Sequence, residues 1–347
     1  MIWSGFLLFV LILLTLDLGV FNRRPRVIGL RAAVLWSLVW VALSLAFTVA
    51  IYDGYAHHRL GLGIVPDAVD GRVNDGASAA AKYLAGYLLE KSLSVDNLFV
   101  IAVIFRFIAV PAELQHRVLF WGVLGAMILR GVMIGLGVEL ISHHHWVLYL
   151  LSGFLLITGM RMLLAGDRPP DPARNLVLRI MRRFLPISDR FDGHKFTTIE
   201  QGRRILTPLA LALVLIETAD AAFATDSIPA IFGVTADPFL IFTSNILAVL
   251  GLRSLYFALS GLLDRFHLLK VSLAVILILV AVKIVAAHWL APGAAYALTP
   301  YLLGVIAVLL AAGILASMLA RSISSRNKKQ GPHWHPAELG PSPRRAR

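Results

Sequence analysis

The side chains best placed to do chemistry in this chain are acids that interrupt long apolar stretches. Six acids lie more than three residues inside such stretches, and they are Asp17, Glu90, Asp96, Glu217, Asp220 and Asp226. An unpaired acid at the centre of a membrane helix costs roughly 2.5–3.5 kcal/mol on insertion scales. Two arrangements offset that cost: ion pairs with basic side chains, or a bound cation or water-filled path.

Basic side chains lie in the same kind of stretch, among them Lys91, Arg130, Arg161, Arg253 and Lys283. Ion pairing alone is therefore one interpretation of the acids. Two patterns favour a cation site instead. Most of the acids cluster on two stretches, whereas four of the bases lie on others. Two acids six residues apart also point about 120° apart on an ideal helix, so an unbroken helix would not aim both at one site. We predict that the bases form gates or switchable ion pairs around that site.

Pro229 predicts a break in the second acidic stretch. Proline lacks an amide hydrogen and clashes with the turn before it, so we expect the helix to break near residues 225–229. A broken helix exposes carbonyl oxygens, which transporters use to coordinate cations. Glu217 and Asp220 are three residues apart and share one helix face, and Asp226 would join them after the break.

The candidate ligands are carboxylate, amide, hydroxyl and carbonyl oxygens, because the chain has no cysteine and no histidine deep in an apolar stretch. Oxygen ligands favour the hard divalent ions Mn²⁺, Mg²⁺ and Ca²⁺ over Cu⁺ or Zn²⁺. Residue types do not choose among those three ions. Protons on the same carboxylates are a candidate counter-ion. The lack of cysteine also excludes disulfides, thiolate metal sites and cysteine nucleophiles.

The elements that must position these residues are membrane helices. The 347 residues are 58% apolar and 15% charged, with a mean hydropathy of +0.78, which predicts an all-α polytopic membrane protein. The chain is expected to form a single transmembrane transporter domain over 1–320. About nine spans are predicted, at 2–21, 32–52, 79–105, 118–140, 146–164, 207–232, 239–262, 272–289 and 300–320.

The basic residues of the loops predict the orientation. Loops 22–31, 106–117, 165–206 and 263–271, with the tail from 321, carry 24 Lys and Arg, whereas the loops on the other side carry two. The positive-inside rule then places the N-terminus outside and the C-terminus in the cytoplasm. The net charge of +12 has the same explanation, so no nucleic-acid partner is predicted.

Three polar segments lie outside the predicted spans. Two of them have two interpretations each. The basic cytoplasmic loop 165–206 is either a solvated linker or a segment lying on the anionic inner leaflet. The histidines at 143–145, including His143 and His145, form either an exposed turn or a metal-capturing cluster. The cytoplasmic tail 321–347 is expected to be disordered.

Two groups of three spans resemble one another, at 79–164 and 207–289. The charged positions that coincide are Glu90 with Asp220, Asp96 with Asp226, Arg130 with Arg253, and Arg161 with Lys283. Agreement in three successive spans indicates an internal repeat. Because three is odd, the second copy enters the membrane from the opposite side, which predicts a 3+3 inverted-topology repeat with a site at the midplane between the copies. Spans 2–21, 32–52 and 300–320 are additional.

Four motifs resemble the TerC family of integral membrane proteins: "LDLGVF" (16–21), "EKSLSVDNLFV" (90–100), "ETADAAFATDSIPAIF" (217–232) and "FTSNILAVLGLRSLYF" (242–257). The family belongs to a lysine-exporter-like group built from inverted three-span repeats. The resemblance implies manganese efflux across the inner membrane of a bacterium. It also implies a link to tellurium resistance and, in some members, metal loading of exported proteins.

By that resemblance the metal-site candidates are Glu90, Asp96, Asn97, Glu217, Asp220, Asp226 and Ser227, and Asp17 matches the acid of the family's first span. We therefore predict a secondary transporter that exports Mn²⁺, has no permanently bound cofactor and is not an enzyme. Transport of Ca²⁺, protons or a tellurium oxyanion, and a role in membrane-protein assembly, are the alternatives. An aspartyl protease would need a Gly-x-Gly-Asp span, which the sequence lacks. The expected partners are a divalent ion and the lipid bilayer, with a homo-oligomer and exported metalloproteins left open.

Overall fold

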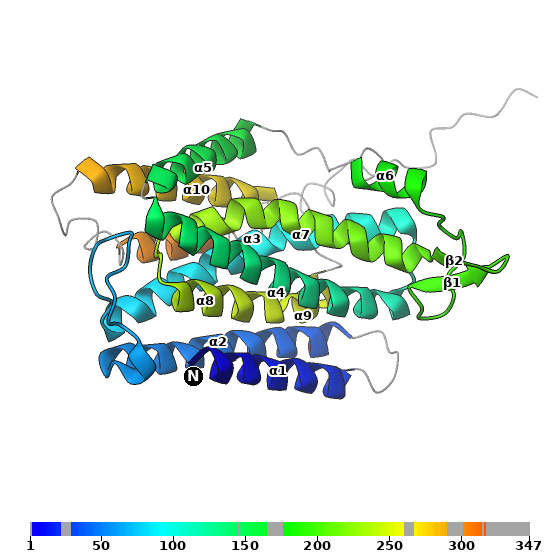
Figure 1. Ribbon diagram of the computed structural model, residues 1–347, viewed down its shortest axis with the longest axis horizontal. Coiled ribbons are helices and arrows are strands. Elements are labelled where there is room, and N and C mark those ends of the chain that lie inside the picture. The colour runs from blue at the N-terminus through cyan, green and yellow to red at the C-terminus, as the bar shows by residue number, and fades with distance from the viewer. Residues whose placement is uncertain are drawn as a thin grey trace, which may run out of the picture.

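The structure is a computed structural model that describes residues 2–21, 29–144, 146–164, 176–259, 267–289, 301–313 and 316. Long helices run side by side in one bundle, with a short hairpin at one end (Figure 1). The elements are α1 (Ile2–Phe21), α2 (Leu30–Ala56), the 3₁₀ turn η1 (Arg59–Gly61), α3 (Gly76–Ile108), α4 (Ala112–His143), α5 (Trp146–Leu164), α6 (Leu176–Phe184), β1 (Thr197–Glu200), β2 (Arg203–Leu206), α7 (Pro208–Phe232), α8 (Pro238–Leu250), α9 (Leu252–Leu259) and α10 (His267–Trp289). A further helix covers Tyr301–Gly313.

The bundle has two different ends. The "loop end" carries residues 57–75, between α2 and α3, and the "hairpin end" carries β1 and β2 (Figure 1). Helix α3 starts at the loop end, whereas α7 starts at the hairpin end directly after β2. The two helices therefore run in opposite directions, as an inverted repeat requires, and the repeat itself stays a prediction.

The helices agree with the predicted class of membrane protein. Among the described residues, five helices are long and apolar enough to cross a membrane, and three shorter apolar helices accompany them. Helix α3, with 33 residues, is also long enough, but charged side chains interrupt it. Predicted span 300–320 is described only as Tyr301–Gly313, and His145 and the tail 321–347 lie outside the described residues.

The predicted break at 225–229 is wrong. Helix α7 continues through Pro229 and ends at Phe232. A proline at this place removes only the bond from its own nitrogen, and it lies in the last turn, where little helix remains to be disrupted. The carbonyl oxygen of Pro229 itself accepts a hydrogen bond from Gly233 at 3.1 Å. Helix α7 is therefore continuous across residues 225–229.

An interruption occurs instead in predicted span 239–262, where Gly251 separates α8 from α9. A side chain at Gly251 would approach the Lys91 ammonium to 2.9 Å and the Trp40 Cβ to 3.0 Å, so only glycine leaves room for both neighbours. Lys91 donates a hydrogen bond to the carbonyl oxygen of Ala248 at 3.2 Å, close to the end of α8. This lysine occupies the interruption and satisfies one of the last carbonyls of the helix.

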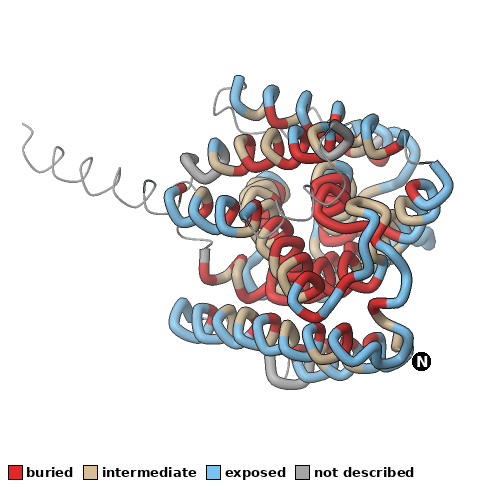
Figure 2. The backbone as a smooth tube through the Cα atoms, turned by 90° about the vertical axis from the view of Figure 1, so that its left-hand side faces the viewer, coloured by how far each residue is buried: buried red, intermediate tan, exposed pale blue. Residues whose placement is uncertain are grey.

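The inner helices are the most buried part of the molecule. Seen from the loop end, buried residues gather in the middle of the bundle and exposed ones on the outer helices (Figure 2). Helix α3 packs against α2, α7 and α8, and α7 packs against α3 and α4. These contacts surround Glu90, Arg130 and Asp220 with protein.

Candidate functional site

Arg130 forms the centre of a buried polar cluster in the middle of the bundle. Its side chain is 1% exposed and projects from α4 toward α3, α7 and α8. The guanidinium donates to Glu90, and it holds both oxygens of Asp220 at 2.9 and 3.2 Å. A third contact joins Arg130 to the amide oxygen of Asn245 at 3.0 Å. One cation therefore serves two carboxylates from two antiparallel helices, with a bidentate geometry that lysine could not reproduce.

Two oxygens beside this cluster accept no hydrogen bond from any described residue. They are Oε2 of Glu90 and Oδ1 of Asn97, and both are buried. The amide nitrogen of Asn97 lies 3.5 Å from Asp220, so Asn97 belongs to the same cluster. Buried acceptors without donors are costly. Carboxylate and amide oxygens are the ligands that a hard divalent cation prefers, so the donor set fits such an ion.

A cavity of about 30 Å³ adjoins the cluster on the side of the hairpin end, and it has room for one water molecule or one cation. Its lining includes Asn97, Asp220 and Arg253, together with apolar residues from the halves of α3 and α4 nearer the hairpin end. The cavity therefore lies on the side of the Arg130 cluster that faces the hairpin end.

The other predicted metal ligands lie on the same two helices, α3 and α7. Asp226 accepts a hydrogen bond from Thr158 of α5 at 3.2 Å. Glu217 lies against Gly125 of α4. The buried Ser227 hydroxyl has no hydrogen-bond partner among the described residues, and Asp96 is half-buried on α3. Within the described residues, no group of three or more acidic or histidine side chains is arranged to hold a metal.

The remaining predicted gate residues occupy different environments. Arg253 forms a buried ion pair with Asp17 at 2.7 Å, so the first helix is tied to α9. Lys283 is buried and donates to the carbonyl oxygen of Gly233 at 3.0 Å. Arg161, its counterpart in the predicted repeat, is exposed on α5. His143 and His144 are exposed as well, and His143 lies 3.4 Å from Glu139.

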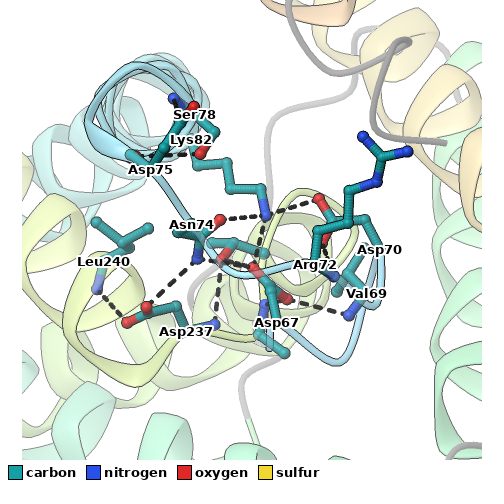
Figure 3. Close-up of polar contacts among 12 residues, drawn as sticks. Asp67, Val69, Asp70, Arg72, Asn74, Asp75, Ser78, Lys82, Asp237 and Leu240 are labelled. Carbon is teal, nitrogen blue, oxygen red and sulfur yellow. Dashed lines mark hydrogen bonds and ion pairs between the residues drawn. The ribbon is translucent and has the colours of Figure 1, made fainter. Parts of the chain in front are cut away.

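A second buried network closes the loop end, and sequence reasoning missed it (Figure 3). The Lys82 ammonium lies 2.8 Å from Asp67, 2.8 Å from Asp70 and 2.6 Å from the amide oxygen of Asn74. The side chains of Lys82, Asp67 and Asp70 are at most 1% exposed. A lysine inside a predicted span is as unusual as an arginine there. Lys82 was therefore the residue from which this network could have been predicted.

Asp67 joins the 57–75 loop to the turn between α7 and α8. It accepts hydrogen bonds from the Thr235 hydroxyl and from the Ala236 amide at 2.8 Å. Burial alone would raise the pKa of Asp67, but the Lys82 ammonium and these donors hold it below its usual value. Burial raises the pKa of Asp237, a shift partly opposed by its hydrogen bond from Tyr55.

The fold and the two networks define a polytopic helical membrane protein with ionised groups buried inside its bundle. Residues 75–328 match the family described as "Integral membrane protein TerC family". The chain belongs to the TerC family, as its motifs predicted. No solved structure matches the chain.

Relatives match over almost the whole chain. The "Uncharacterized membrane protein STKORF319" of Myxococcus xanthus is 42% identical over 92% of each chain. The "Putative membrane-bound redox modulator Alx" of Escherichia coli K12 is 43% identical over 82% of this chain and 85% of its own. A Rickettsia bellii membrane protein is 36% identical over 94% of this chain and the whole of its own.

Proposed function

We propose that this chain is a secondary transporter that exports a hard divalent cation, with Mn²⁺ as the first candidate. The observation that carries the proposal is the Arg130 cluster, in which Glu90 and Asp220 meet across two antiparallel helices beside two unpaired oxygens. Arg130 neutralises the same two carboxylates that would hold the ion. An arriving cation would compete with the guanidinium for the carboxylates, and the exchange would couple binding to helix movement.

The two ends of the bundle support alternating access with the loop end closed. The Lys82 network ties the loop to the bundle at that end, whereas the cavity beside Asp220 lies on the opposite side of the cluster. With the basic loops in the cytoplasm, the hairpin end would face the cytoplasm of a bacterium and receive the ion there. Protons on the released carboxylates would serve as counter-ions. The proposal has no covalent step, so no enzyme activity is implied.

The name of the Escherichia coli relative suggests a redox role as a second candidate. This chain has no cysteine, so it cannot carry out thiol–disulfide chemistry itself. Movement of a redox-active metal ion remains a route by which such a membrane protein would affect redox state. Transport of Mn²⁺ is thus compatible with that name.

The proposal is tested by Mn²⁺ flux in proteoliposomes, with Mg²⁺, Ca²⁺ and Zn²⁺ as competitors. Glu90→Gln and Asp220→Asn should each lower the flux at least about tenfold, as expected for loss of a ligand group. Asp96→Asn and Asp226→Asn test two of the remaining predicted ligands. Glu139→Gln removes an exposed acid of α4 and is the matched control. If the folded wild type carries no divalent ion, the transporter proposal is wrong.

A second prediction tests whether Glu217 contributes to transport. An alanine at position 125 would bring its Cβ to 2.0 Å from the Glu217 carboxylate, so that side chain must move. Gly125→Ala should therefore lower Mn²⁺ flux while changing the free energy of unfolding by no more than about 1 kcal/mol. Gly135→Ala is the control on the same helix, because nothing lies within 4 Å of its Cβ. Equal flux in both variants would remove Glu217 from the transport path.

A further inference from the structure

Helix α6 has more apolar surface than the protein core covers. Leu178 and Met181 are buried and share an apolar cluster with Leu209 and Leu211 of α7. On another face, Leu176, Ile180 and Phe184 are 63%, 46% and 72% exposed. These three residues are four positions apart and form one continuous strip, here called the apolar strip.

Basic side chains adjoin the apolar strip. Arg179 and Arg183 are exposed, and at 100° per residue they occupy the sector next to Leu176. The guanidinium carbon of Arg183 lies 5.8 Å from the centroid of the Phe184 ring, so charge and apolar surface are neighbours. A strip of large apolar residues bordered by arginine is typical of a helix that lies in a membrane interface.

The position of α6 along the bundle agrees with that interpretation. It packs against α7, and its partners Leu209 and Leu211 belong to the first turn of that helix (Figure 1). The first turn of a spanning helix lies where hydrocarbon gives way to headgroups. At that depth the apolar strip would contact acyl chains, and the arginine side chains would extend to lipid phosphates.

We propose that α6 is an anionic-lipid contact, in which the apolar strip enters the membrane interface and Arg179 and Arg183 bind the phosphates of anionic phospholipids. The partner is an anionic bilayer because the exposed surface combines apolar area with positive charge. Since α6 packs on the first turn of α7, the helix that carries Asp220, lipid binding would hold that helix in place. The contact itself does not depend on which ion, if any, the protein transports.

The lack of cysteine allows a single probe on the full chain. Ile180→Cys carries a polarity-sensitive fluorophore, and the protein is reconstituted in phosphatidylcholine alone or mixed with phosphatidylglycerol. A spin-labelled lipid with its label near the top of the acyl chain serves as the quencher. We expect stronger quenching in the mixed vesicles. Adding Arg179→Gln and Arg183→Gln should weaken the preference for phosphatidylglycerol about 30-fold, because each basic residue near the surface contributes about 1 kcal/mol.

Arg203→Gln with Arg204→Gln is the matched control, because it removes two exposed charges from β2 in the same segment. It should leave the preference unchanged. High salt on the Ile180→Cys protein repeats the test without altering the arginines, and it should weaken the preference as well. Equal quenching in both vesicle types would overturn the anionic-lipid contact. A probe that is not quenched in either, together with disulfide-linked dimers of the unlabelled Ile180→Cys protein, would assign the strip to a second copy of the chain.

Discussion

Replacing Arg130 by glutamine is expected to lower the free energy of unfolding by about 3–5 kcal/mol. Glu90 and Asp220 would then remain inside the bundle without their shared cation, and an unpaired buried charge is among the costliest defects in a protein. The measurement is thermal or denaturant unfolding of the purified protein in detergent. Lysine at position 130 should recover only part of the loss, since it keeps the charge without the bidentate geometry.

A matched control is Arg59→Gln, which breaks an exposed pair with Asp53 and should cost less than about 1 kcal/mol. Combining Arg130→Gln with Glu90→Gln and Asp220→Asn should restore most of the stability, because no charge is left in this cluster. An Arg130→Gln protein as stable as the wild type would show that the carboxylates do not depend on the guanidinium.

The triple variant also separates folding from transport. It should fold and yet carry no Mn²⁺, because the ligand carboxylates are gone. A triple variant that folds and still transports would move the ion site away from Arg130. Such a result would leave the lipid contact of α6 untouched, since that contact is read from quenching and not from flux.

The sequence identified most of the Arg130 cluster through the rarity of charge in apolar stretches. Glu90 and Asp220 were paired by the repeat alignment, and Arg130 was predicted to be a gate. The alignment could not indicate that one arginine would serve both acids, because that contact depends on how four helices pack. Asn245 was missed for the same reason, since an uncharged amide in a span gives little signal.

The wrong predictions of local structure arose because the effect of a proline or glycine depends on its position within a helix. Pro229 predicted a break, but a proline in the last turn removes little. The interruption at Gly251 was not predicted. A side chain at this position would come within 3.0 Å of both Lys91 and Trp40. The loop-end network was missed because Asp67 and Asp70 were assigned to an outer loop, where acids are usually solvated.

Replacing Lys82 by methionine is expected to release the 57–75 loop from the end of the bundle. Asp67 and Asp70 would lose a cation 2.8 Å away while remaining buried, so the loop should leave its position and expose them to water. Ala68, half-buried against the apolar cluster that includes Phe232 and Ala236, is a suitable reporter. In the cysteine-free chain, Ala68→Cys should react with a membrane-impermeant maleimide at least about tenfold faster when Lys82 is methionine.

Lys195→Met is the control for this experiment, because it removes an exposed lysine that pairs with Asp192 at the opposite end. It should leave the labelling rate at position 68 unchanged. Adding Asp67→Asn and Asp70→Asn to Lys82→Met should slow the labelling again, since neutral side chains can stay buried. If the loop is also the outer gate of a transporter, Lys82→Met should let the ion leak through the loop end. Equal labelling with and without Lys82 would mean that helix packing, not this ion-pair network, closes that end.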